Sequence, residues 1–451
     1  MCGGNMRKVS KFNAAMVLGS LTAAVALLAG VPGAAAEPAS GVSDDSISGQ
    51  AAPGGGSFPG SFLVPGTNTS IHIGGLARGS YMWDASAPPG GPSQPDVTVT
   101  EAIPLEGSGA HSLHGGLRFH ARQSNIFTDV RTPTPYGEMD AFILLDFFGA
   151  SSAGNENTAN TQNARLVLAY GTLGPFLAGQ TFSLWFDGDA LPESVDPTPT
   201  IGVMNGLTNR KPQLRYTFAA GGGLSIAGSL ENPETEGISN ANVPGAAFTT
   251  NSLGGIDTSP TAVVRVRLDQ AWGHVALSAM AVPQSVTAPG QARISKEGYG
   301  AELSGHLNTF GKDTLKAQAM IGKGLGNYMS DFTTIGGLQA NLATGAATVP
   351  LSYGFNIGYT HFWTNTLRST IDAGYAHLNL DSGIISVAAV QAGVDKRHIG
   401  AFGNLFWSPV PQVDLGIEYE WAQRETHLAL TGGNSNKGEM NRVEAEAAFK
   451  F

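Results

Sequence analysis

RVEAEAAFKF, residues 442–451, ends the chain in strict alternation. Small or apolar side chains occupy every second position, and the charged side chains of Glu444, Glu446 and Lys450 lie between them. A period of two is typical of a β-strand with one apolar and one polar face. The final residue is the aromatic Phe451. We therefore expect the end of the chain to be a structural strand rather than a frayed tail.

The same alternation recurs toward the amino terminus, in segments of about 8–12 residues that turn residues separate. The clearest segments are IHIGGLARGSYMWD (71–84), GLRFHARQ (116–123), QLRYTF (213–218), VVRVRLD (263–269), LSYGFNIGYTHF (351–362) and VDLGIEYEW (413–421). Short connections near 171–175, 219–223, 270–273, 309–313, 364–366 and 408–412 alternate with long polar ones. This asymmetry predicts an antiparallel meander that crosses a bilayer.

Counting strands between these connections gives about sixteen, and an even count returns the last strand to the first. In hydrocarbon every backbone N–H and C=O needs an internal partner, so a spanning sheet must close. The predicted fold class is all-β: a transmembrane antiparallel β-barrel over residues 71–451, with short periplasmic turns and long extracellular loops. Phe451 is expected to end the closing strand as an assembly signal. The alternative, a secreted soluble β-sandwich or β-helix, leaves the loop asymmetry and the 13% charged content unexplained.

The amino-terminal segment predicts export. Basic residues precede the apolar run 14–30, and Ala34-Ala35-Ala36 forms a small-residue cleavage site, so residues 1–36 are interpreted as a signal peptide. A membrane anchor is the alternative. The single cysteine, Cys2, lies inside this segment. Residues 37–70 are predicted to be a flexible Pro/Gly/Ser-rich lead-in. The net charge of −10 argues against general nucleic-acid binding.

Arginines recur on the polar faces that would line the lumen. The set comprises Arg78, Arg118, Arg122, Arg165, Arg215, Arg265, Arg267 and Arg368. Most belong to the first half of the strand order, whereas the polar-face carboxylates from Glu302 onward belong largely to the second. A basic wall facing an acidic one would produce a transverse field that attracts and guides carboxylates. The alternative is that each arginine neutralises a neighbour, for example Asp146 with Arg122 or Arg165.

The long connection near 183–211 follows the fifth predicted strand. Its apolar opening, Leu184, Trp185 and Phe186, could anchor on the inner wall. Its carboxylates would then face basic residues; they are Asp187, Asp189, Glu193 and Asp196. A barrel this wide needs an internal segment to narrow it, so this loop is predicted to form the constriction. A surface loop with an Asp-rich cation site is the alternative.

Enzymatic motifs are missing from the sequence, which contains no GxSxG elbow, HExxH helix or phosphate-binding glycine loop. We therefore expect no enzymatic activity, no cofactor and no metal site. A hydrolase built into the barrel would need a Ser–His pair on adjoining strands, which sequence alone cannot identify. A barrel that acts as a receptor or adhesin through its long loops is the other alternative.

Several motifs taken together resemble the DcaP-like outer-membrane porins. The combination of TPTPYGEMD (132–140), LLDFFG (144–149) and YGTLGPFLAGQTFSLWFD (170–187) is specific, and RKPQLRYTF with NLFWSPVPQVDLGIEYEWAQRE extends it. The resemblance implies a trimeric barrel in the outer membrane of a Gram-negative bacterium, surrounded by lipid, that passively admits small anionic, dicarboxylate-like solutes. It also implies an arginine-lined narrow region, with Arg118, Arg122, Arg165 and Arg215 in matching motifs. Some members carry a coiled-coil segment before the barrel, whereas residues 37–66 show no heptads.

Overall fold

The computed structural model describes residues 55–86, 97–149, 163–204, 210–240, 257–287, 292–429 and 435–451. The chain divides into two compact units, Met1–Ala34 and Ala35–Phe451, and all described residues belong to the second. The predicted signal peptide, and the lead-in as far as residue 54, lie outside the described residues. None of the helices in the described ranges is long and apolar enough to span a membrane.

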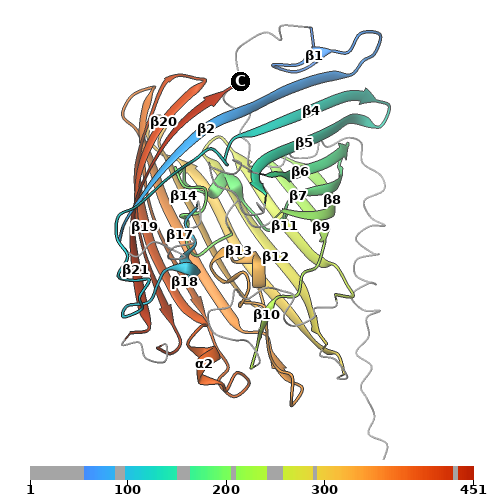
Figure 1. The fold of residues 1–451 in the computed structure, drawn as a ribbon. Coiled ribbons are helices and arrows are strands. Elements are labelled where there is room, and N and C mark those ends of the chain that lie inside the picture. Colours follow the sequence, from blue (N-terminus) through green and yellow to red (C-terminus); the bar gives the residue numbers. More distant parts are fainter. Residues whose placement is uncertain are drawn as a thin grey trace, which may run out of the picture. The chain divides into compact units, whose positions relative to one another are not determined.

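Sixteen strands form one antiparallel ring (Figure 1). Its members are β2 (Ser70–Ser86), β4 (Asn125–Thr134), β5 (Gly137–Gly149), β6 (Asn163–Leu173), β7 (Phe176–Phe182), β8 (Arg210–Gly221), β9 (Leu224–Glu231), β11 (Thr261–Gln270), β12 (Gly273–Val286), β13 (Ile294–Asn308), β14 (Thr314–Lys323), β17 (Leu351–Phe362), β18 (Leu367–Leu378), β19 (Asp395–Val410), β20 (Val413–Thr426) and β21 (Lys437–Lys450). Each pairs with a neighbour on both sides, which confirms the predicted barrel.

The barrel closes where the last strand meets the first. β21 pairs with β2, with Lys450 opposite Leu76, and Gly75 and Phe451 exchange backbone hydrogen bonds of 3.0 and 3.1 Å. On its other edge β2 pairs with β4 and with the short β3 (Gly116–His120), so these two strands act as one interrupted strand. β1 (Phe62–Leu63), from the predicted lead-in, pairs with the start of β2. The ring therefore satisfies backbone polar groups internally, as hydrocarbon demands.

The alternation seen in the sequence becomes an outer and an inner face. Leu277 and Ile371 are 57% and 66% exposed, whereas Arg442 and Glu444 on inward positions are fully buried. Successive side chains of a strand point to opposite faces, so the apolar set faces outward and the polar set faces the interior. The in–out assignment predicted for all six quoted segments agrees with the burial pattern.

Connections of very different length lie at the two ends of the barrel. Seven short connections join the strands at one end, which we name the turn end; residues 174–175, for example, use Gly174 at φ 56°. A seventh turn, at residues 135–136, was not predicted. The long connections lie at the opposite end, the loop end, so the predicted asymmetry is confirmed.

The long connections contain the remaining elements. They are η3 (Thr100–Ala102), η4 (Gly188–Ala190), β10 (Gly237–Ser239), η6 (Gly326–Tyr328), η7 (Ser330–Phe332), β15 (Leu338–Asn341), β16 (Ala346–Thr348) and α2 (Ala388–Gln391). β10, β15 and β16 form a small separate sheet, parallel between β10 and β15 and antiparallel between β15 and β16.

The sequence predicted a polar interior, but part of the interior is apolar. Trp185, Met204, Tyr328 and Phe332 from two connections pack into one buried apolar cluster with inward-facing wall residues such as Met280. The alternation of these strands therefore changes character along their length, from polar-in to apolar-in, where connecting segments fold back into the barrel. This cluster forms an apolar core inside the cylinder.

Candidate functional site

The connection 183–204 between β7 and β8 lies inside the barrel. Leu184, Trp185 and Phe186 are at most 4% exposed and belong to the apolar cluster. The start of the segment is held by Glu231 at the end of β9. The Glu231 carboxylate accepts hydrogen bonds from Ser183 Oγ at 2.6 Å and from the backbone N–H of Leu184 at 2.8 Å. The apolar start of the segment thus enters the barrel, because burial of apolar surface contributes about 25 cal/mol of stabilisation per Å² removed from water.

Two carboxylates fix the next part of this segment to the wall. Asp187 accepts hydrogen bonds from His274 of β12 at 2.8 Å and from Ser304 of β13 at 2.5 Å, and Asp189 pairs with Arg267 of β11 at 2.8 Å. Burial alone would raise the pKa of Asp187. The hydrogen bond from His274 and the positive charge of Arg265 outweigh burial and hold this pKa below its usual range.

The second half is fixed to β18, β19 and β20. Glu193 forms a two-bond pair with Arg368 at 2.6 and 2.5 Å. Asn404 donates to the backbone carbonyl of Glu193 at 2.8 Å, and the Glu418 carboxylate accepts from the backbone N–H groups of residues 195 and 196 at 3.0 and 3.1 Å. Such charge-assisted bonds are the stronger kind, so the backbone of this segment is held over several strands.

Glycines on the wall let this segment approach closely. A Cβ on Gly358 of β17 would lie 2.4 Å from the Cγ atom of Pro192, and one on Gly374 of β18 would lie 2.2 Å from the carbonyl oxygen of Ile201. Any larger residue at either position would push the segment into the lumen. We call the inner faces of β11–β21, on which the segment lies, the loop wall, and those of β3–β8 the basic wall.

The predicted lumenal arginines divide between these two walls. Arg267 and Arg368 bind carboxylates of the inward segment, and Arg78 of β2 contacts Glu446 at 2.6 Å and donates to the carbonyl of Val195. Arg265 donates to Ser278 at 3.1 Å. These four arginines lie on the loop wall or beside the segment, where Arg78, Arg267 and Arg368 hold it in place. Carboxylates of the segment therefore pair with basic side chains: Asp189 with Arg267, and Glu193 with Arg368.

The basic wall carries the other four predicted arginines, and two of them pair with carboxylates of the described residues. Arg118 pairs with Asp84 at 3.1 Å, and Arg165 forms a two-bond pair with Asp146 at 3.0 and 2.5 Å. Arg215 donates to Gln213 and to the carbonyl of Phe182. The alternative of local neutralisation therefore describes Arg118 and Arg165 in part.

A group of three guanidiniums stands out on the basic wall. The Cζ atoms of Arg122 and Arg165 lie 5.0 and 5.4 Å from the centre of the same Phe148 ring. Arg210 interacts electrostatically with Arg165 and Asp146. We name Arg122, Arg165 and Arg210 the basic cluster; Asp146 is the carboxylate paired within it.

Sequence reasoning missed Arg210, because this residue was assigned to the long connection that precedes β8. The structure begins β8 at Arg210, opposite Phe182 of β7. The adjacent Arg210-Lys211 pair before Pro212 is the only local signal that could have drawn attention to it.

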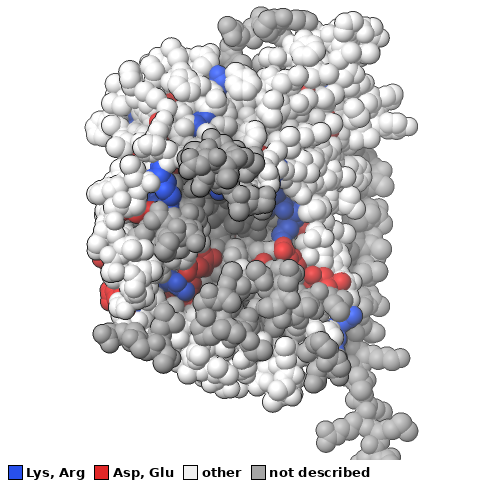
Figure 2. Space-filling model, in the orientation of Figure 1, with Lys and Arg blue, Asp and Glu red and all other residues white. Residues whose placement is uncertain are grey.

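Figure 2 shows how charge is distributed on one face of the molecule. Lysine, arginine, aspartate and glutamate gather around the hollow of that face, whereas the described surface away from it is almost entirely uncharged. Inward-facing carboxylates on the loop wall include Glu302, Asp372, Glu420 and Glu444, each at most 6% exposed. Buried arginines such as Arg267 and Arg442 lie on the same wall, so the loop wall contains charges of both signs.

Comparisons with known proteins agree with this architecture. A family model described as "Porin subfamily" matches residues 59–449. The outer membrane channel DcaP of Acinetobacter baumannii is 20% identical, with a TM-score of 0.67 over 86% of this chain and 99% of that one. An anion-selective porin from Comamonas acidovorans shares the fold at 10% identity, with a TM-score of 0.51 over 85% and 100% of the two chains.

One curated relative matches a shorter stretch. Outer membrane protein IIIA of Rhizobium leguminosarum bv. viciae is 28% identical over 170 residues, which is 37% of this chain and 36% of the relative. The match therefore spans about a third of that protein's length. At these identities the solved structures establish the fold, and the family model establishes membership.

Proposed function

The chain belongs to the porin subfamily, and from that premise we propose that it lets small anionic, dicarboxylate-like solutes diffuse passively through an arginine-lined pore. The family and the fold are those of an outer-membrane channel rather than an enzyme. The proposed route runs between the inward segment 183–204 and the basic wall. It involves no covalent step and no cofactor.

The basic cluster is the observation that carries the proposal. The carboxylates of the inward segment already bind arginines of the loop wall, Arg267 and Arg368 among them. In the basic cluster three guanidiniums lie near Asp146 and the Phe148 ring, so this part of the wall gathers several hydrogen-bond donors that suit an anion. Guanidinium groups bind carboxylates through parallel hydrogen bonds, and two such groups at short spacing suit a solute with two carboxylates.

We further propose that segment 183–204 sets the size cutoff. A sixteen-stranded barrel is wide enough to leave an aqueous channel unless something fills it. The segment crosses the interior from Glu231 on β9 to Asp331 in η7, where the Gly202 N–H donates at 2.7 Å. Its contacts with many strands would hold the opening at a fixed width.

The proposal also covers assembly. We propose a homotrimer embedded in outer-membrane lipid, on the basis of the resemblance to DcaP-like porins. Phe451, 64% exposed beside the closing pair of strands, would serve as the assembly signal. Exposed aromatic side chains at strand ends suit the interfacial girdle of a barrel.

Planar-bilayer recording tests the pore and its selectivity together. The wild-type protein should give stepwise conductance with a reversal potential that favours anions across a salt gradient. The triple variant R122S/R165S/R210S should shift the reversal potential toward cations, because it removes three positive charges from the basic wall. Current blockade by succinate should weaken in the same variant, relative to a matched neutral solute.

The matched control is R397S. Arg397 pairs with Glu425 and lies on β19 two positions before the outward-facing Ile399. The R397S variant should leave the reversal potential unchanged. An unaltered reversal potential in the triple variant would overturn the anion proposal, and a barrel that never conducts would favour the receptor or adhesin alternative.

A further inference from the structure

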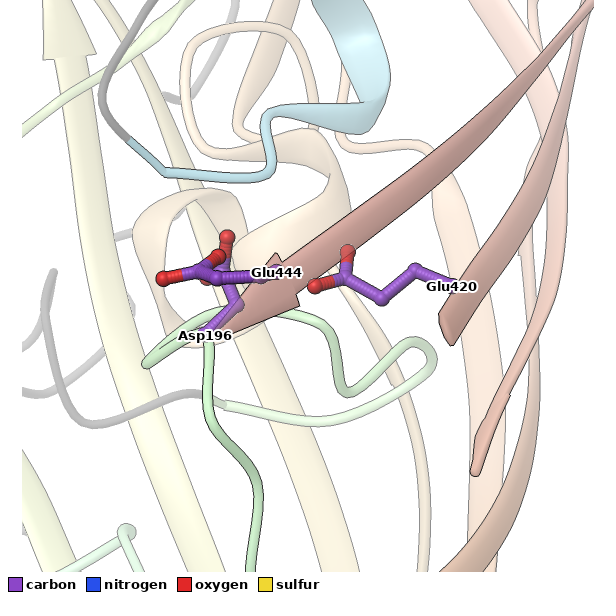
Figure 3. A group of neighbouring side chains, drawn as sticks. All are labelled: Asp196, Glu420 and Glu444. Carbon is purple, nitrogen blue, oxygen red and sulfur yellow. The ribbon is translucent and has the colours of Figure 1, made fainter. Parts of the chain in front are cut away.

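Three carboxylates converge inside the barrel next to its closing seam. They are Asp196 of the inward segment, Glu420 of β20 and Glu444 of β21, and their nearest oxygen atoms all lie within 4.8 Å of one another. Figure 3 shows the carboxylates of Asp196 and Glu444 side by side, with that of Glu420 extending toward them from its own strand. All three side chains are at most 2% exposed.

The hydrogen bonds of this group leave oxygens without a donor. Neither carboxylate oxygen of Glu444, nor Oε1 of Glu420, accepts a hydrogen bond from any residue in the described ranges. The other Glu420 oxygen accepts from Thr98 Oγ1 at 2.5 Å, and Asp196 accepts from the Thr98 N–H at 2.7 Å. A buried carboxylate that lacks partners is costly, so these oxygens are placed where a positive ligand would stabilise them.

Nearby arginines do not balance the charge. Arg442 directs its Nε atom to Asp84 at 2.8 Å and places Nη1 3.4 Å from Asp196, while Arg118 also pairs with Asp84. The carboxylates of this neighbourhood are Asp84, Asp196, Glu418, Glu420, Glu444 and Glu446, and its guanidiniums are those of Arg78, Arg118 and Arg442. Six carboxylates against three guanidiniums leave a formal excess of three negative charges.

We propose that Asp196, Glu420 and Glu444 form a binding site for a hard divalent cation of the Ca²⁺ class. All available ligands are oxygens, which Ca²⁺ and Mg²⁺ prefer. Ca²⁺–oxygen distances of about 2.3–2.6 Å put two ligands of one ion at most about 4.6–5.2 Å apart, so oxygens that lie within 4.8 Å of one another can share one ion. Ca²⁺ also accepts flexible geometry, whereas Mg²⁺ demands near-octahedral order, so Ca²⁺ is the ion chosen for the test.

This inference goes beyond the proposed function and departs from the expectation of no metal site. The sequence had left open a cation site on a surface loop; the geometry places it inside the barrel instead. A cation there would tie the inward segment to β20 and β21 beside the β21–β2 closure. It would thereby stabilise the segment that the proposed function requires, without being part of the basic wall.

Direct binding of Ca²⁺ to the purified, folded protein in detergent tests the site. The protein is stripped with EDTA, dialysed into metal-free buffer and titrated with Ca²⁺ by calorimetry, with metal content checked by mass spectrometry. We expect about one Ca²⁺ per chain. E444Q and D196N should each weaken binding by about tenfold or more, because each removes a ligand charge.

The matched control is E439Q, which makes the same substitution at an exposed position on the same strand and should bind Ca²⁺ like the wild type. D196N changes a connecting segment rather than a strand, so it tests the site if E444Q fails to fold. The folding of each variant is checked by its heat-modified migration on gels. Wild-type protein that binds no Ca²⁺, which would mean that protons neutralise the cluster, overturns the proposal. So does binding that D196N and E444Q leave unchanged. Neither result depends on whether the pore conducts anions.

Discussion

The basic wall and the loop wall follow the same alternation but use their arginines differently. On the loop wall, Arg267 and Arg368 contact carboxylates of segment 183–204. On the basic wall, Arg122 and Arg165 contact the Phe148 ring, Arg165 pairs with Asp146, and Arg210 lies near both charges. An inward arginine is therefore an anchor or a candidate solute contact according to what lies opposite it, which a strand pattern cannot show.

The largest expected effect comes from removing the apolar anchor of the loop wall. W185A deletes a fully buried side chain, and such a change costs about 3–5 kcal/mol. The cost should fall on the packing of segment 183–204, so single-channel conductance should rise and become noisier while the strands stay folded. W407A removes a tryptophan that is half exposed on the outer face and should leave conductance unchanged. If W185A had the same conductance as the wild type, segment 183–204 would not form the constriction.

A pH titration sharpens the comparison, because buried acids lie at the loop end, and the larger shift belongs to Glu236. Burial, helped by the charge of Glu234, raises the pKa of Glu236 from 4.5 to about 8. The folded state therefore holds a proton that the unfolded state has lost between these values, so packing here weakens as pH rises from about 5 to 8. This shift in pKa corresponds to on the order of 5 kcal/mol of stability that is lost as the pH rises through this range.

Hydrogen exchange measures this effect. Residues 231–240 and 326–338 should exchange faster at pH 8.5 than at pH 5.5, after correction for the intrinsic rate, while β4–β6 of the basic wall should not change. E236Q should remove most of the difference, and E439Q should retain it. A uniform response of both walls would contradict the local origin.

The smallest effect is expected from a single added methyl group. G358A places a Cβ 2.4 Å from Pro192 Cγ, so the segment must move away from the loop wall at a cost of about 1–3 kcal/mol. Conductance should fall modestly, because the segment shifts toward the basic wall. In G403A the nearest atom to the new Cβ is 3.9 Å away, on the outward-facing Ile371, so conductance should not change. An increase in G358A would place the open route on the other side of the segment.

Much of the fold could be predicted because its rule is local. The period of two from Ile71 to Phe451 fixed which face each strand buries, and the even strand number required β21 to meet β2. The pairing of Asp146 could not be decided, because a register irregularity between Leu144 and Leu145 determines that Arg165 lies opposite it. Arg210 was missed because a strand boundary is weakly marked in sequence.

The sequence by itself determined the closed barrel, its two faces and its two unequal ends, because neighbouring side chains in one strand report the environment of both faces. Only the tertiary structure decided which charges meet. Glu193 and Arg368 are separated by 175 residues, and Asp196 and Glu444 by 248, yet they become neighbours when one connection folds inward. That fold depends on apolar packing among several connections and on glycines that leave room at the wall, and neither has a local signature in the chain.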